Sequence, residues 1–319
     1  MKSSIWPYLL VAAVGLCIGI PLFLFNPWLL EDLHSQSYVW FLDFSKTIFQ
    51  PQSAYYSESI LLPLLARMLG ASKTLIAYKL FCSLLTICIL PITAIFALTY
   101  LQSVCKTLIF IVLFGFSFQY FQFYILGFPD PLTILLLVLV VFQKRFGAIF
   151  GLLILAMLSH FSMAALGAVG LAFMFYLSPS ASLSYTRKSA GAVIIAIAFG
   201  KVLLVTWYAV FHYQLVSRLD WVLGKGYTFF LGRYETDVIG FWLTPGIFFL
   251  ITYFLVTAYF LMQKRYAFMA SALLALAISY FALFCTIDGL RVFSVIIAAP
   301  YTYLLLSFIQ SLSICKTAD

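Results

Sequence analysis

Residues 75–101 read LIAYKLFCSLLTICILPITAIFALTYL, an almost unbroken apolar run. A helix needs about 20 consecutive apolar residues to cross the hydrocarbon core of a bilayer, so this run is long enough to span a membrane. The rest of the chain has the same character, because 65% of its 319 residues are hydrophobic and only 9% are charged. Ordinary soluble domains carry about 25% charged residues. The sequence therefore predicts an all-α, polytopic helical membrane protein.

Further apolar runs extend this pattern over the whole chain, and we expect about ten transmembrane helices, within a range of nine to eleven. The first run follows Lys2 and is too long for a signal-peptide core, which predicts an uncleaved first helix. Residues 131–177 are interpreted as three short helices. The chain 1–319 is expected to form a single integral membrane domain. The predicted spans are 5–30, 75–101, 107–127, 131–143, 146–159, 161–177, 191–213, 244–263, 267–287 and 290–312.

The placement of charge predicts the orientation. If the helices alternate, one side of the membrane receives short basic loops with Lys2, Lys106, Lys144, Arg145, Arg187, Lys188, Lys264, Arg265 and Lys316. By the positive-inside rule this side is cytoplasmic, and both termini lie there. The opposite, periplasmic side receives a first outer loop (31–74), a second large outer loop (214–243) and every acid except Asp319. The compact chain favours a bacterial inner membrane.

The net charge of +8 thus reflects orientation in a lipid bilayer and does not indicate a nucleic-acid partner. The sequence contains no Walker loop, GxGxxG, GxSxG or HExxH motif, which excludes the ATPases, dehydrogenases, serine hydrolases and zincins that depend on them. The six cysteines show no CxxC or zinc-ligand spacing and are predicted to be small core residues.

Acidic residues mark the first outer loop. Glu31 and Asp32 stand where the first helix leaves the membrane, and a half-buried carboxylate there can bind a cation or take a proton from a nucleophile. The alternative is an interfacial cap that holds the helix end in water. Two short interfacial helices are predicted behind this pair, over 37–49 and 58–70. The other candidate contacts for a sugar or an acceptor in this loop are Asp43, Tyr55, Tyr56 and Glu58.

Two polar residues interrupt the apolar runs in the middle of the chain. Asp130 lies between Pro129 and Pro131, which stop one helix and open the next, so its carboxylate is expected either to cap that helix or to contact substrate. His160 falls at the junction of two apolar segments. A neutral imidazole there can bond a backbone carbonyl or contact a ligand.

Basic residues on the outer side are candidates for binding a phosphate. Arg291 begins the last span three residues after Asp288, close enough for an ion pair and placed to offer a fork of donors to a phosphate. Lys201 lies near the middle of its span. A charge is costly at that depth, so Lys201 is a functional candidate. Arg218 lies in the aromatic-rich second outer loop, which either steers phosphate and stacks on sugar or forms an interfacial belt.

The order of these features resembles the GT-C superfamily of integral-membrane glycosyltransferases, which use polyprenyl-phosphate-linked sugars. Members have an acidic exit from the first helix, an aromatic surface helix and a Pro-Leu-rich segment ending in Leu-Gly-x-Ser, similar to 31–32, 37–49 and 62–72 here. A Pro-Asp turn that opens a helix is similar to 128–136 here, and a Gly-Leu-Leu-x-Leu-Ala-x-Leu run is similar to 151–158. A late helix with an Arg at its outer end is similar to 291–300. The resemblance covers about residues 1–175 and 285–310.

The resemblance implies a GT-C-like fold and an inverting transfer in which an acidic residue of the first outer loop activates or orients the acceptor. Some members do this with a divalent metal such as Mg²⁺ or Mn²⁺. By motif position the role falls on Asp32, with Glu31 as its neighbour or substitute. His160 stands near the place where such enzymes usually have a Lys, so the chain resembles a divergent or reduced member.

The leading hypothesis is a glycosyltransferase that moves a sugar from a polyprenyl-phosphate donor to a glycan, lipid or protein acceptor on the periplasmic face. Arg291, with Lys201 or Arg218, is expected to hold the phosphate of the carrier. One alternative is a transporter or flippase of a lipid-linked or small anionic solute, with Lys201 as the intramembrane charge. Another is an oligosaccharide polymerase or ligase that acts on the same carriers.

Overall fold

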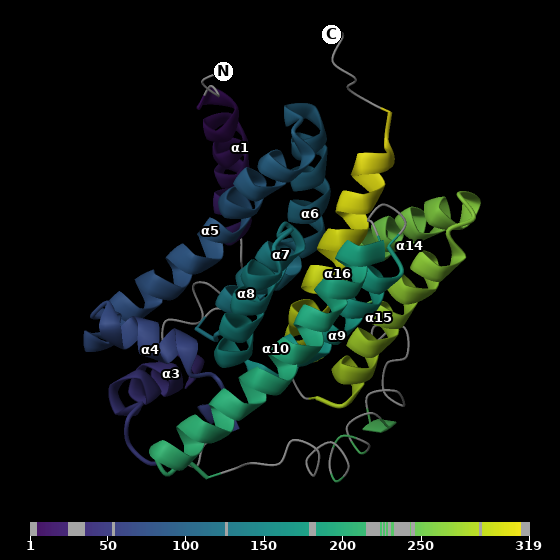
Figure 1. Cartoon of the computed structure of the whole chain (residues 1–319). Coiled ribbons are helices and arrows are strands. Elements are labelled where there is room, and N and C mark those ends of the chain that lie inside the picture. Colours follow the sequence, from purple (N-terminus) through teal and green to yellow (C-terminus); the bar gives the residue numbers. More distant parts are fainter. Residues whose placement is uncertain are drawn as a thin grey trace.

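The computed structural model describes residues 5–24, 36–52, 55–124, 127–178, 183–214, 246–286 and 289–313, with isolated positions between 224 and 243. Within these ranges the regular structure is entirely helical, without strands (Figure 1). This confirms the prediction of an all-α protein.

A helix is present at each of the predicted spans. They are α1 (Trp6–Leu24), α5 (Leu75–Leu101), α6 (Val104–Tyr124), α7 (Asp130–Val141), α8 (Phe146–Ser159), α9 (Phe161–Tyr176), α10 (Leu183–Val210), α14 (Ile247–Met262), α15 (Tyr266–Phe284) and α16 (Gly289–Ser311). In the described part of the chain, α1, α5, α10, α15 and α16 are long and apolar enough to cross a membrane. The chain is therefore a helical membrane protein. The three short helices predicted within 131–177 are present as α7, α8 and α9.

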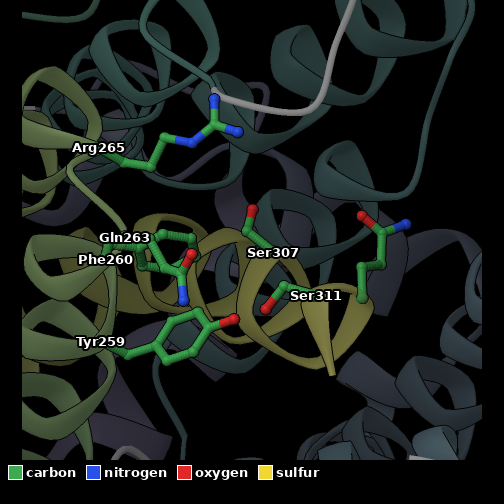
Figure 2. A pocket seen from close by; sticks show the side chains of 7 residues that line it. Tyr259, Phe260, Gln263, Arg265, Ser307 and Ser311 are labelled. Atoms are coloured by element: carbon green, nitrogen blue, oxygen red, sulfur yellow. The ribbon is translucent and has the colours of Figure 1, made fainter. Parts of the chain in front are cut away.

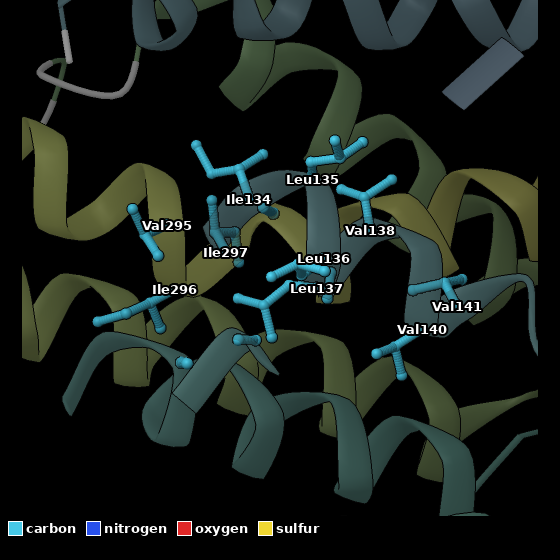
Figure 3. Packing of buried hydrophobic residues seen from close by; sticks show 14 of the residues in the cluster. Ile134, Leu135, Leu136, Leu137, Val138, Val140, Val141, Val295, Ile296 and Ile297 are labelled. Carbon is cyan, nitrogen blue, oxygen red and sulfur yellow. The ribbon is translucent and has the colours of Figure 1, made fainter. Parts of the chain in front are cut away.

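Helix α16 lies at the centre of the bundle. It contacts α6, α7, α9, α14 and α15, and nearly all of its side chains are buried. Helix α9 comes especially close, since a Cβ atom added to Gly167 would lie 2.9 Å from the carbonyl oxygen of Ile296. Small residues allow such close backbone packing between membrane helices. Figure 3 shows the apolar side chains of α7 and α16 that pack together in this core.

The outer helices cover this centre. Helix α1 packs on α5 and α6, and α10 packs on α8 and α9. A glycine again permits the closest approach, because a Cβ atom added to Gly15 of α1 would lie 2.9 Å from the Cα atom of Pro91 in α5. The connections between consecutive helices from α5 to α9 are short, so these neighbours run antiparallel.

In the described part of the segment between α1 and α5, the helical elements are α3 (Gln36–Thr47), η2 (Tyr55–Glu58), α4 (Leu61–Met68) and η3 (Ala71–Lys73). Helix α3 is amphipathic, with Phe41 and Phe44 buried and Trp40 exposed. Gly70 ends α4 with a positive φ of 73°, a conformation that glycine adopts without strain. Short helices over 37–49 and 58–70 were predicted, and the structure confirms them.

The two ends of the bundle differ in charge. The described acids are Asp43 in α3, Glu58 at the end of η2 and Asp130 at the start of α7. The end of the bundle that carries α3 and α4 is called here the site end (Figure 1). The opposite end, called here the basic end, carries the start of α1, the end of α16 and the basic loops (Figure 1). Lys144, Arg145, Lys264 and Arg265 lie in those loops, and Lys106, Arg187 and Lys188 lie near the starts of α6 and α10. This segregation agrees with the helix pattern expected from the sequence.

The cysteines only partly follow the prediction of small core residues. Cys82 and Cys285 are buried, as expected. Cys17 is exposed on α1, and Cys105 at the start of α6 is disulfide-bonded, so the prediction was wrong for these two. Cys17 is exposed because α1 packs against the bundle along one side only.

Candidate functional site

Polar side chains gather at the site end around residues 159–162, where α8 ends and α9 begins. His160 interrupts the two helices with an extended backbone, at φ −158° and ψ 97°. Its N–H donates to the carbonyl of Ala156 at 2.9 Å, and its own carbonyl accepts from the N–H of Ala164 at 3.0 Å. His160 therefore closes one helix and opens the next, and its side chain is buried at this junction.

Ser159 connects this junction to the start of α7. Its hydroxyl donates to the carbonyl of Pro129 at 3.2 Å and accepts from the hydroxyl of Thr133 at 2.8 Å. Both hydroxyls are fully buried. Because Pro129 directly precedes Asp130, these bonds join the backbone at the start of α7 to the end of α8.

Asp130 forms a buried ion pair with Arg291. The Nη1 atom of Arg291 lies 3.0 Å from Oδ2 of Asp130, with side-chain exposures of 5% and 0%. The guanidinium also lies over the ring of Phe128, 4.1 Å from its centre. Within the described part of the chain, the second carboxylate oxygen, Oδ1, is buried without a hydrogen-bond partner. The pair joins residues 161 positions apart in sequence.

This pairing corrects the expectation that Asp130 caps its helix, and it gives Arg291 a partner that the sequence did not indicate. Asp130 was expected either to cap the helix or to contact substrate, but the N-cap of α7 is Pro129, no side chain caps it, and Asp130 is the first helical residue. The carboxylate still benefits from the positive end of the helix dipole. Arg291 was placed close enough to Asp288 for an ion pair. The partner found is Asp130, and Asp288 lies outside the described residues.

Glu58 reaches the same junction from the segment between α1 and α5. It is 8% exposed, and its Oε2 atom accepts a short hydrogen bond of 2.6 Å from the hydroxyl of Ser162. Ser162 lies in the first turn of α9, where the helix dipole favours a nearby carboxylate. The hydroxyl of Ser57, the residue before Glu58, lies 3.3 Å from the hydroxyl of Tyr208 in α10. Glu58 is thus held between α9 and α10.

Two more contacts fix this segment on the end of α10. The hydroxyl of Tyr213 donates to the carbonyl of Ile48 at 2.6 Å, and the N–H of Gln214 donates to the carbonyl of Gln52 at 2.8 Å. Burial raises the pKa of the Tyr213 phenol, so it remains a protonated donor at neutral pH. The short helices therefore lie in a defined position against the site end.

Lys201 approaches the junction from outside the bundle. Its side chain is exposed on α10, and its Nζ atom lies 5.0 Å from the centre of the Phe161 ring. A cation at this distance is attracted by the face of the ring. The sequence predicted a charge within the membrane span, and the structure places Lys201 on the exposed outer surface of α10, in contact with Phe161, the residue that follows His160.

The remaining predicted residues lie elsewhere or are not described. Asp43 lies on the exposed face of α3, where it pairs with Lys46 at 3.5 Å. Tyr55 and Tyr56 open η2, but their side chains are outside the described residues. Glu31, Asp32, Arg218 and Asp288 also lie outside the described residues.

Sequence reasoning missed the hydroxyl groups that organise the site. Ser159 and Ser162 flank His160 at positions −1 and +2, and each bonds a different element. The string Ser-His-Phe-Ser between two apolar runs is the signal that could have identified them. Polar residues at membrane depth require partners, so a cluster of them in one place predicts a contact centre.

The described residues form no group of three or more His, Cys, Asp or Glu side chains that could hold a metal ion. Glu58 and Asp130 reach the junction from different elements and bond different partners, Ser162 and Arg291. Glu58 and Lys201 instead contact the 159–162 segment, which contains His160, and the Asp130–Arg291 pair lies at the start of α7, to which Ser159 bonds. Such a set can bind a phosphate and move a proton.

Comparisons of the chain with protein-family models, curated proteins and solved structures gave no match.

Proposed function

We propose that this protein is a membrane glycosyltransferase that transfers a sugar from a polyprenyl-phosphate carrier to an acceptor. The observation that supports it is the set of contacts made by residues 159–162. Ser159 bonds the start of α7, Phe161 contacts Lys201, and Ser162 bonds Glu58. Polar and charged groups from four elements therefore meet at one end of an apolar bundle. A substrate with a long lipid tail and a charged, sugar-bearing head requires this combination.

Arg291 and Lys201 are the proposed contacts for the carrier phosphate. Arginine binds phosphate through a planar fork of donors, and one of its nitrogens is already oriented by Asp130. Lys201 lies on the outer surface of α10, where a lipid-linked phosphate arriving from the bilayer reaches it first. Arg218 and His160 complete the proposed set, with Asp288 beside Arg291 in sequence.

Asp32 and Glu31 remain the proposed catalytic acids, and Glu58 and Asp130 are proposed substrate contacts. In an inverting transfer, a carboxylate takes the proton from an acceptor hydroxyl as that oxygen bonds to the anomeric carbon. The bond from that carbon to the phosphate oxygen breaks, and the polyprenyl phosphate leaves as an anion. The buried Oδ1 of Asp130 supports a substrate contact, because a sugar hydroxyl can donate to it. Asp43, Tyr55 and Tyr56 are proposed acceptor contacts, and any metal, Mg²⁺ or Mn²⁺, would need Asp32 or Glu31.

We further propose a GT-C-like arrangement of about ten spans, with the site end facing the periplasm of a bacterial inner membrane. The basic loops favour a cytoplasmic basic end, since Lys and Arg collect in cytoplasmic loops. The disulfide of Cys105 favours the reverse, because disulfides are rare in the cytosol. We give the basic residues more weight because several of them lie at that end, whereas the disulfide is a single feature.

The transporter or flippase alternative depends on Lys201 as a charge inside the bundle. Its exposed position on α10 gives that alternative less support. A polymerase or ligase would use the same carrier and the same groups, with a glycan as acceptor.

The test is transfer by the full chain in nanodiscs supplied with a panel of radiolabelled polyprenyl-phosphate sugars. We expect release of polyprenyl phosphate and loss of that release in the double variant Glu31→Gln, Asp32→Asn. The control is Asp319→Asn, which removes an acid at the other end of the chain. Transfer that survives the double variant would contradict the catalytic assignment. Solute flux into proteoliposomes that survives Asp32→Asn and is lost in Lys201→Ala would favour the transporter.

A further inference from the structure

A pocket of about 210 Å³ lies at the basic end of the bundle, far from residues 159–162. It is formed between the end of α14 with the turn that follows and the last turns of α16. Figure 2 shows Tyr259 and Gln263 on one side and Ser307 and Ser311 on the other. The polar groups that line it are those of Tyr259, Gln263, Arg265, Ser307, Gln310 and Ser311. Arg265 is the charged member of this lining, and none of these residues is acidic.

The surroundings strengthen the positive potential of this pocket. Lys264 is adjacent to Arg265 in the chain, and the Nζ atom of Lys106 donates to the carbonyl of Gln310 at 3.3 Å. The open carbonyls at a helix C-terminus carry partial negative charge, which would otherwise repel an anion from the end of α16. Lys106 offsets that charge. Asp43, Glu58 and Asp130, the described acids, are not among the residues that line the pocket.

The position of the pocket along α16 indicates its depth in a membrane. Arg291 and Ser311 lie about 20 residues apart on this helix, a separation of about 30 Å at 1.5 Å per residue. The hydrocarbon core of a bilayer is also about 30 Å thick. With Arg291 at one headgroup layer, the pocket therefore lies at the headgroup layer of the opposite leaflet.

The size and the donors define the ligand. A volume of about 210 Å³ corresponds to about seven waters at ~30 Å³ each and is smaller than the ~300–1,000 Å³ of pockets for drug-sized ligands. It accommodates a phosphate with a few attached atoms. Arg265 can supply a guanidinium, Gln263 and Gln310 amide donors, and Ser307 a hydroxyl, which are the groups that bind phosphate. Phe260, which is 4% exposed, supplies a buried apolar wall.

We propose that this pocket binds a phosphate group of about the size of glycerol phosphate, as in the headgroup of an anionic phospholipid. Two sources share this chemistry, a lipid of the surrounding leaflet and a free phosphate ester in solution. The proposal does not rest on glycosyl transfer, because the pocket and the 159–162 segment lie at opposite ends of α16.

The experiment titrates the full chain in a neutral detergent and follows its thermal unfolding temperature. Three probes are compared: short-chain phosphatidylglycerol, phosphatidylcholine of equal chain length, and glycerol 3-phosphate. A ligand that binds the folded state raises the unfolding temperature in a concentration-dependent way, which gives an apparent dissociation constant. We expect phosphatidylglycerol to bind and phosphatidylcholine to have no saturable effect.

Arg265→Gln is expected to weaken binding at least about tenfold, the typical effect of losing a charged hydrogen-bond donor. Lys264→Gln is the matched control, because it removes an adjacent charge that does not line the pocket, and we expect less than about a threefold effect. Ser307→Leu fills the pocket and keeps every charge, so it is expected to weaken binding at least about tenfold even if Arg265→Gln fails to fold.

Binding of glycerol 3-phosphate with the same dependence on Arg265, and without binding of phosphatidylglycerol, would identify a soluble ester as the source. Binding of phosphatidylglycerol identifies the lipid. Equal losses in Arg265→Gln and Lys264→Gln, or equal effects of phosphatidylglycerol and phosphatidylcholine, would overturn the proposal. In the first case the basic surface as a whole would explain the stabilisation, and in the second case lipid in general would explain it.

Discussion

Arg291→Gln and Asp130→Asn each leave one buried charge without its partner. The two charged atoms lie 3.0 Å apart, and the side chains are 5% and 0% exposed. Removing one member of such a pair costs about 3–5 kcal/mol, because the other charge remains away from water. The double variant leaves two neutral polar groups, so we expect its cost to fall short of the sum of the single costs by about 2 kcal/mol or more.

The assay is the free energy of unfolding in bicelles, measured by steric trapping for the four members of the cycle. Asp43→Asn is the matched control, since Asp43 pairs with Lys46 at 3.5 Å with side-chain exposures of 63% and 48%. An exposed pair of this kind contributes about 0–1 kcal/mol. Additive costs for Asp130→Asn and Arg291→Gln, or a cost for Arg291→Gln no larger than that of Asp43→Asn, would refute a buried, coupled pair.

Three further predictions concern packing, the Glu58 contact and orientation. Gly167→Ala is expected to destabilise the fold by about 1–3 kcal/mol, because the new Cβ atom would lie 2.9 Å from a backbone carbonyl oxygen. The control Gly151→Ala should be neutral in the same unfolding assay, because no atom lies within 4 Å of its Cβ position. Ser162→Ala removes the donor to Glu58 and is expected to cost about 1–3 kcal/mol, whereas Ser162→Thr, which keeps the hydroxyl, should restore stability. In a chain without native cysteines, a membrane-impermeant maleimide should label Asp43→Cys and not Arg145→Cys in intact spheroplasts, and the reverse pattern would contradict the proposed orientation.

The helices could be predicted because each apolar run identifies its own helix. Residues 131–177 contain three runs that are short for full spans. Lys144-Arg145 and His160 separate these runs in the sequence, and the structure has α7, α8 and α9 there. Tertiary packing was not predictable in this way. Nothing in the run 289–311 distinguishes it from its neighbours as the central helix, because burial by other helices and exposure to lipid both select apolar residues.

The site was predictable residue by residue but not as an arrangement. Asp130, His160, Arg291 and Glu58 were recognised because charged and polar groups are costly at membrane depth. Their partners were not recognised, since the Asp130–Arg291 pair spans 161 positions and the Glu58–Ser162 bond spans 104. A local interpretation therefore assigned Asp130 to its own helix end and did not pair it with Arg291. The basic-end pocket was missed for the same reason, because Arg265 and Ser307 meet only in the fold.

The ion pair also separates a structural role of Arg291 from a functional one. If Arg291 serves only to neutralise Asp130, the double variant Asp130→Asn, Arg291→Gln removes both charges, and stability and sugar transfer should recover together relative to Arg291→Gln alone. If Arg291 binds the carrier phosphate, stability recovers and transfer does not, because no other guanidinium lies at that position. Charge-assisted bonds to phosphate contribute about 1.5–3 kcal/mol, so transfer should remain at least about tenfold below the wild-type rate. Recovery of transfer in the double variant would remove Arg291 from the proposed phosphate contacts and leave Lys201 and Arg218.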